Sequence, residues 1–277
     1  MTDLLSRFFR FYIHLSVAVL LGGLGFFILF LLVRSSSAVT TKNLSIAAEL
    51  LPAVTGTVAV TVLSVSLAAP AGVMLGVFIN EYTGGKTREF LIFVFKVMGG
   101  MPSIVVGIFG FMIILLFFKI IPLGLRPSLI VSAFSLAILV LPYIVHATIL
   151  ALRSVPLKER LSALGLGAQK YQNIFYILLP GSIKPIFSGI ILAIGRSIED
   201  TAVIMLTGVA AMAGHPSSLF RPFEALPFFI YIRSCEYRHP DELSYVYIAS
   251  VIIIIICSLM IITSSYFQKK LLVKFNS

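Results

Sequence analysis

Long apolar runs, each close to the length of a membrane-spanning helix, are the strongest constraint on this chain. A helix needs about 20 consecutive apolar residues to cross the hydrocarbon layer of a bilayer. Apolar residues make up 59% of the sequence and charged residues only 12%, whereas soluble proteins carry about 25% charged residues. The sequence therefore predicts an all-α membrane protein with about six transmembrane helices. Their approximate bounds are 11–33, 52–79, 99–118, 128–150, 177–212 with a break inside, and 244–267.

The N-terminal run is longer than the apolar region of a cleaved signal peptide, which has about 7 to 15 residues. We therefore expect residues 1–51 to form a retained anchor helix and an outer linker, and residues 52–277 to form the main transmembrane domain. A further apolar stretch, Phe90–Val97, is too short to cross a bilayer and contains Lys96. It predicts a surface-lying or re-entrant helix that leads into the third span.

The distribution of basic residues predicts the orientation of the chain, because Lys and Arg accumulate on the cytoplasmic side of membrane proteins. With a cytoplasmic N-terminus, thirteen basic residues flank the spans on that side and seven on the other. This predicts a multi-pass protein of the cytoplasmic (inner) membrane with both termini cytoplasmic. The basic residues lie at span ends and not in a soluble basic-aromatic segment, so the net charge of +10 does not indicate nucleic-acid binding.

Leu161–Pro180 is a polar, glycine-punctuated segment between two long apolar runs. Apolar residues recur in it at three- and four-residue spacing, which is typical of a helix with one face against an apolar surface. Gly165 and Gly167 each weaken a continuous helix by about 1 kcal/mol relative to Ala. The pattern predicts a docking element made of two short helices around a glycine joint. Its apolar stripe consists of Leu161, Leu164, Ala168, Tyr171 and Phe175.

The segment Gly167–Pro180 has the order Gly, nine residues, Ile, one residue, Leu and Pro, which resembles the cytoplasmic loop signature of ABC importer permeases. That signature begins with Glu-Ala-Ala, where this chain has Leu161–Ala163, and the nearest acid is Glu159. The resemblance implies an ABC type I importer permease fold with a coupling loop at about 153–176. It also implies contacts between this loop and a separate ATPase, at Glu159, Leu161, Ser162, Ala163, Gly167, Ala168 and Tyr171.

Three charged residues lie close together inside the fifth predicted span. Arg196, Glu199 and Asp200 are spaced at i, i+3 and i+4, so both acids share a helix face with the guanidinium. A charge at the bilayer centre costs about 2.5 to 3.5 kcal/mol even on the insertion scale. The cluster predicts a cavity or a partner subunit on this face, unless the span boundary is displaced by a turn and the ion pair is interfacial.

This stretch is also similar to the Arg-Ala-x-Gly-Glu-Thr-Ala motif of permeases in the phosphate-import branch of the same family. Arg, Gly, Glu and Thr of the motif fall at Arg196, Glu199, Asp200 and Thr201, so Glu199 is an additional acid. The resemblance implies that these four residues lie on the substrate pathway. We expect Arg196 to meet the anion, because a guanidinium engages phosphate oxygens in a bidentate way.

Two other segments, 101–109 and 141–156, are similar to the same branch and follow in its order. Overall length and the single N-terminal span resemble the smaller, A-type subunit. The resemblance implies a permease that forms a path for phosphate with a second permease. Two copies of a cytoplasmic ATPase and an extracytoplasmic phosphate-binding protein are the other implied partners. Permeases for molybdate, sulfate or phosphonates stay open as alternatives, as does a stand-alone secondary transporter.

No set of residues is typical of an enzyme site. Gly84–Thr87 ends like a phosphate-binding loop, but the first glycine of that pattern would be Asn80, and no soluble domain surrounds it. The four histidines and two cysteines lack metal-ligand spacing. We expect a transport subunit without a cofactor or metal of its own. An outer segment, 215–247, has acids that could meet an extracytoplasmic partner: Glu224, Glu236, Asp241 and Glu242.

Overall fold

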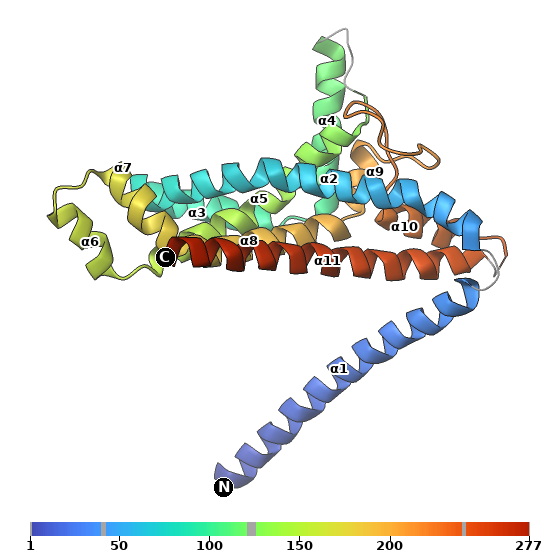
Figure 1. Cartoon of the computed structure of the whole chain (residues 1–277), viewed down its shortest axis with the longest axis horizontal. Helices are drawn as coiled ribbons and strands as arrows, with labels where there is room; N and C mark the ends of the chain where they lie inside the picture. Colours follow the sequence, from blue (N-terminus) through green and yellow to red (C-terminus); the bar gives the residue numbers. More distant parts are fainter. Residues whose placement is uncertain (1, 40–42, 121–125, 240–241, 277) are drawn as a thin grey trace.

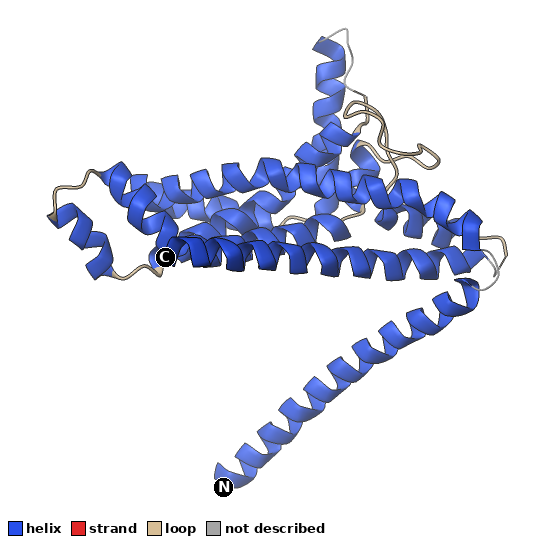
Figure 2. Cartoon of the chain, in the orientation of Figure 1, coloured by secondary structure: helices blue, strands red, loops and turns tan. Residues whose placement is uncertain are grey.

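A computed structural model describes residues 2–39, 43–120, 126–239 and 242–276, and within them the chain is a bundle of helices joined by loops (Figure 1, Figure 2). Five helices are long and apolar enough to cross a membrane, and a sixth crossing is counted if one bent helix pair forms a single span. The all-α fold with about six spans is therefore confirmed. The helices are α1 (Thr2–Val39), α2 (Asn43–Val77), α3 (Gly85–Gly100), α4 (Ser103–Ile120), α5 (Leu129–Arg153), α6 (Leu157–Gly165), α7 (Lys170–Asn173), α8 (Leu179–Glu199), α9 (Ala202–Thr207), α10 (Leu226–Glu236) and α11 (Leu243–Asn276).

Two π-helical turns extend these helices. The turn η1 (Phe78–Tyr82) continues α2, and η2 (Ile174–Leu178) joins α7 to α8. Both turns belong to the end of the bundle at which α6 and α7 lie, and α11 also ends there, whereas α10 lies at the opposite end (Figure 1). One wider helical turn re-aims the residues that follow it, and such turns are frequent at functional sites.

Helix α5 is the centre of the bundle, packed between α2 and α8. Glycines allow this close approach. A Cβ atom added at Gly76 of α2 would lie 2.6 Å from the Cβ of Thr148, and one at Gly189 of α8 would lie 2.2 Å from the Cβ of Ala147. Small residues at helix interfaces are the general means of close packing in membranes, where lipid tails offer no hydrophobic advantage to helix association. Packing is thus the reason for these two glycines.

The third predicted span, 99–118, contains a sharp bend near its start. Helices α3 and α4 are bent by 100° relative to each other at Met101–Pro102, and Figure 1 shows α4 turned away from the bundle. Helix α3 packs against α5 through Phe95, which is buried in a cluster with Val145 and Ile149, and the bend suits the predicted surface-lying or re-entrant helix. The physical reason is the proline, which disfavours the helical conformation of the preceding residue; Met101 is accordingly extended, with ψ of 139°.

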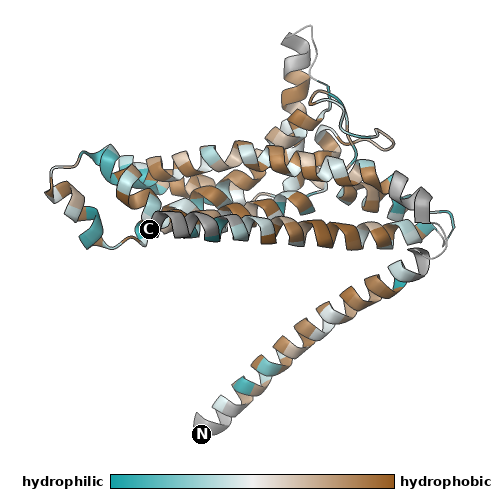
Figure 3. Ribbon diagram, viewed as in Figure 1, coloured by the Kyte–Doolittle hydropathy of each residue, from teal (hydrophilic) through white to brown (hydrophobic). Residues whose placement is uncertain are grey.

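Helix α1 stands apart from the remaining helices and meets the rest of the chain near its C-terminal end (Figure 1). There Leu31 is buried, and the rings of Phe30 and Tyr247 pack edge to face with centroids 5.9 Å apart. Figure 3 shows hydrophobic residues along α1 and α11, with hydrophilic residues gathered at α6 and α7. The exposed apolar sides suit a lipid environment, in which the backbone polar groups are already satisfied inside each helix.

The break expected inside the fifth span lies at Asp200 and Thr201, between α8 and α9. The loop that follows α9 covers the start of α5, whose first amides would otherwise have no acceptor. Ser128 N donates to the carbonyl oxygen of Thr207 at 3.0 Å, and Leu129 N donates to that of Arg221 at 3.1 Å. The segment predicted as an outer loop is therefore an ordered cap, and it also contains α10.

Candidate functional site

The docking element has the predicted form of two short helices around a glycine joint. Helix α6 ends at Gly165, and Gly167 adopts a φ of +84°, in the left-handed region that favours glycine. The amide of Ala168 donates to the carbonyl oxygen of Ala163 at 3.0 Å, which closes the turn after α6. Helix α7 then begins with a capping box, in which Gln169 N donates to Gln172 Oε1 at 2.7 Å.

The apolar stripe of this element faces away from the rest of the chain. The side of α6 that carries Ala163 is turned inward, and Ala163 is 8% exposed. Leu161 and Tyr171 are about half exposed, at 53% and 51%, and Phe175 is 64% exposed. Of the remaining residues with an implied ATPase contact, Glu159, Ser162 and Gly167 are exposed and Ala168 is half-buried. An exposed apolar and aromatic face at the tip of a polar loop has the character of a protein-interaction surface.

An ion pair that sequence reasoning did not anticipate fixes the docking element to the bundle. Arg160 Nη1 lies 3.0 Å from Glu81 Oε1 of η1. A second guanidinium nitrogen of Arg160 donates to the carbonyl oxygen of Leu152, near the end of α5. Arg160 and Glu81 are 79 positions apart in the sequence, so neither helix periodicity nor motif spacing could pair them.

The charged cluster at the end of α8 separates into a bonded pair and an exposed acid. Arg196 Nη2 donates to Asp200 Oδ2 at 3.2 Å, and Asp200 Oδ1 accepts from the amide of Val203 at 2.9 Å, capping α9. The Asp200 side chain is 2% exposed, whereas the Arg196 side chain is 34% exposed. Glu199 is exposed, and Thr201 is half-buried between the two helices. The structure thus brings Arg196 and Asp200 together and leaves Glu199 turned outward.

Arg196 is the more exposed member of this pair. Its side chain is 34% exposed, and its buried Nε has no hydrogen-bond partner among the described residues. The same side of α8 exposes Lys184, Ser188 and Leu192, so it carries one cationic, one polar and one apolar side chain before Arg196. Intramembrane ionisable residues of this kind face the interior of an assembly or a water-filled cavity.

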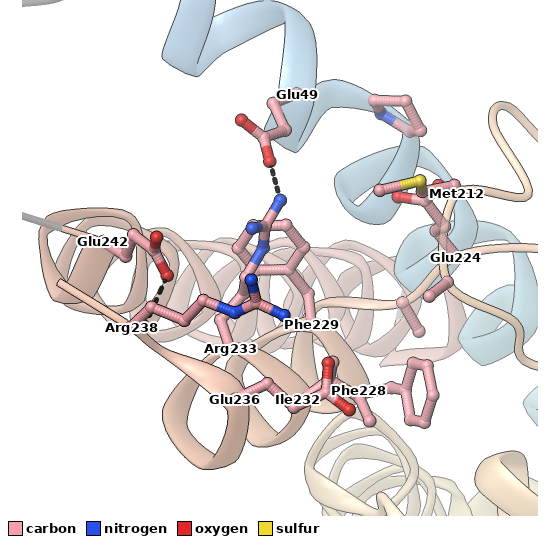
Figure 4. A pocket seen from close by; sticks show the side chains of 13 residues that line it. Glu49, Met212, Glu224, Phe228, Phe229, Ile232, Arg233, Glu236, Arg238 and Glu242 are labelled. Carbon is pink, nitrogen blue, oxygen red and sulfur yellow. Dashed lines mark hydrogen bonds and ion pairs between the residues drawn. The ribbon is translucent and has the colours of Figure 1, made fainter.

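A pocket of about 590 Å³ lies at the opposite end of the bundle, between the start of α2, the loop after α9, α10 and the start of α11 (Figure 4). Arg233 of α10 pairs with Glu49 of α2 across it. Glu242 Oε2 accepts from the backbone amide of Arg238 at 3.1 Å. Three of the four predicted outer acids line this pocket, namely Glu224, Glu236 and Glu242, while Asp241 lies outside the described residues.

In the described part of the chain, no group of three or more His, Cys, Asp or Glu side chains is arranged to hold a metal ion. Gly84–Thr87 opens α3 at the end of the bundle near the docking element. Asn80, at the position where the phosphate-binding pattern would have its first glycine, is bonded to Arg88, which donates to the carbonyl oxygen of Asn80 at 3.1 Å.

Comparison with known proteins assigns these features to one family. The family model described as binding-protein-dependent transport system inner membrane component matches residues 72–274. The phosphate transport system permease protein PstA 1 of Mycobacterium tuberculosis is 36% identical over 143 residues, which are 51% of this chain and 45% of that protein. A probable ABC transporter permease protein of Bacillus subtilis, YqgI, is 31% identical over 185 residues, 62% of this chain and 61% of that protein.

These matches span about half the length of the curated relatives. Among solved structures, a chain of the inward-facing MetNI methionine ABC transporter superposes with a TM-score of 0.67, covering 83% of this chain and 99% of that chain. Sequence identity in that comparison is 16%, so it speaks for the fold alone.

Proposed function

Because the chain belongs to the family of binding-protein-dependent transport system inner membrane components, we propose that it is the A-type permease subunit of an ATP-driven phosphate importer. As an ABC transporter permease it is an integral, multi-pass transport subunit and not an enzyme, and the ATPase activity belongs to a separate chain. In the proposal, it forms the translocation path with a second, similar permease. Two copies of a cytoplasmic ATPase and an extracytoplasmic phosphate-binding protein complete the assembly.

The observation that carries the proposal is the partly exposed side chain of Arg196, on the side of α8 that also exposes Lys184 and Ser188. A phosphate ion bound there would accept charge-assisted hydrogen bonds from Arg196, whose orientation is fixed by Asp200 at 3.2 Å. The second permease would cover this side of α8 and enclose the path, since a polar membrane face requires a partner or water. Glu199 would lie on the same path and oppose anion entry unless a cation of the second permease neutralises it.

The docking element supports the ATP-driven part of the proposal. Its exposed stripe, which includes Leu161, Tyr171 and Phe175, would seat in a cleft of the ATPase on the cytoplasmic side. Closing of the ATPase pair would then move α8 and its neighbours through η2. The switch would be a rigid-body rocking of the bundle about the central site. We expect no cofactor bound in this chain.

The proposed substrate is tested with the complete complex in liposomes that contain ATP. Arg196→Gln is expected to lower the uptake of radiolabelled phosphate at least about tenfold, because losing a hydrogen bond to a charged group costs about 1.5 to 3 kcal/mol. Arg126→Gln, an exposed arginine before α5, is the matched control. Uptake that Arg196→Gln leaves unchanged in an assembled complex would refute the role of Arg196. Stronger competition by molybdate, sulfate or a phosphonate than by phosphate would assign the importer to that oxyanion instead.

A further inference from the structure

Arg160 lies where four structural elements meet. It belongs to α6, its Nη1 donates to Glu81 Oε1 of η1 at 3.0 Å, and a second nitrogen donates to the carbonyl oxygen of Leu152 in α5. The carbonyl oxygen of Arg160 itself accepts from Asn173 Nδ2 of α7 at 3.2 Å. One residue therefore ties both helices of the docking element to the ends of α2 and α5.

The acid partner of Arg160 is held in place by its own neighbours. Asn80 Nδ2 donates to Glu81 Oε1 at 2.6 Å, and Arg88 of α3 donates to Asn80. Beside this ion pair, Lys170 Nζ of α7 lies 4.6 Å from the ring centroid of Tyr82, within the range of a cation–π interaction. The docking element thus has two attachments to η1, and η1 is in turn fixed to α3.

Burial and chemistry make Arg160 and Glu81 a rigid attachment rather than a loose surface pair. Their side chains are 21% and 12% exposed, so solvent competes with the ion pair far less than at an open surface. Leu152 is among the last four residues of α5, whose carbonyl oxygens have no partner inside the helix; its oxygen also accepts from Val155 N of the following turn at 3.3 Å. The planar guanidinium fork serves the carboxylate and this carbonyl simultaneously, which the single ammonium of a lysine cannot do in the same geometry.

We propose that Arg160 and Glu81 form a transmission clamp, which makes the docking element, η1 and the end of α5 move as one unit. Both are positioning residues: neither belongs to the exposed face proposed to contact the ATPase, because the Arg160 side chain is largely buried and Glu81 lies outside the docking element. The clamp rests on the proposed function, since it passes the movement of the ATPase to α2 and α5. Its loss leaves the exposed docking face in place and separates ATP hydrolysis from transport.

The test measures ATP hydrolysis and phosphate uptake together in liposomes that hold the complete complex. Variants are Glu81→Gln, Arg160→Gln, Arg160→Lys and the Glu81→Gln/Arg160→Gln double variant. Lys86→Gln is the matched control, since Lys86 is an exposed cation at the start of α3. The readout is phosphate moved per ATP hydrolysed, in complexes that retain their ATPase, so a variant that merely fails to fold is recognised by loss of the assembly.

We expect the phosphate moved per ATP hydrolysed to fall about fivefold or more in both glutamine variants and in Arg160→Lys. Fivefold is the lower end of the effect that coupling between two sites usually has. The double variant is expected to be no worse than the worse single variant, because both remove one connection. Unchanged ratios in Glu81→Gln, or additive losses in the double variant, would overturn the clamp. A wild-type complex that transports no phosphate would overturn the proposed function itself, which distinguishes the two failures.

Discussion

Replacing Asp200 separates its two roles, capping α9 and pairing with Arg196. Asp200→Asn keeps an oxygen that can accept from Val203 N, now 2.9 Å from Oδ1, and removes the negative charge. Asp200→Ala removes both interactions. Loss of a capping side chain costs about 1 kcal/mol. A fully buried pair broken on one side costs about 3 to 5 kcal/mol, but Arg196 is 34% exposed, so we discount that contribution to about 1 kcal/mol.

We therefore expect the free energy of unfolding to fall by about 2 kcal/mol in Asp200→Ala and by about 1 kcal/mol in Asp200→Asn. The assay is reversible unfolding in mixed detergent micelles, followed by circular dichroism. Glu199→Ala is the stability control, because Glu199 carries the same charge one residue earlier and is exposed; its change should stay within about 0.5 kcal/mol. Equal stability of Asp200→Ala and Asp200→Asn would show that the cap contributes nothing and refute this reasoning.

Two further predictions concern glycines with opposite surroundings. Gly76→Leu is expected to destabilise the protein by about 1 to 3 kcal/mol, because its Cβ would meet Thr148 at 2.6 Å. Gly195→Ala should be tolerated, because a Cβ there has no neighbour within 4 Å. Unfolding of both variants in detergent measures the two free-energy changes. Gly167→Ala, at a φ of +84°, is expected to strain the joint by about 1 to 2 kcal/mol and to reduce retention of the ATPase in a pull-down. Gly165→Ala, at a position without positive φ, is its control, and equal retention in both variants would contradict the role of the joint.

Local patterns in the sequence were sufficient for much of the fold. Apolar run lengths predict the number of spans, and the two glycines of the docking element predict its joint. The bend after α3 also has a local signal in Pro102, which was outweighed by the continuous apolar run around it. The cap at Asp200 could likewise have been recognised, since an Asp three residues before a bonded helix amide is typical of a helix start.

Interactions across the bundle could not be predicted in the same way. The pair of Arg160 and Glu81 depends on how α2 and α5 are placed, and no residue spacing encodes a contact over 79 positions. Spacing alone also did not decide which acid Arg196 meets, because Glu199 and Asp200 were both predicted to share its helix face, and the structure pairs it with Asp200.

The most direct test of the account is a pull-down of the tagged chain, expressed at its native level and purified in mild detergent, followed by uptake measurements in liposomes. The account predicts that an ATPase and a second permease co-purify, and that the purified assembly takes up phosphate only when ATP is hydrolysed. Recovery of the chain alone, with phosphate uptake intact in the absence of any ATPase, would contradict it.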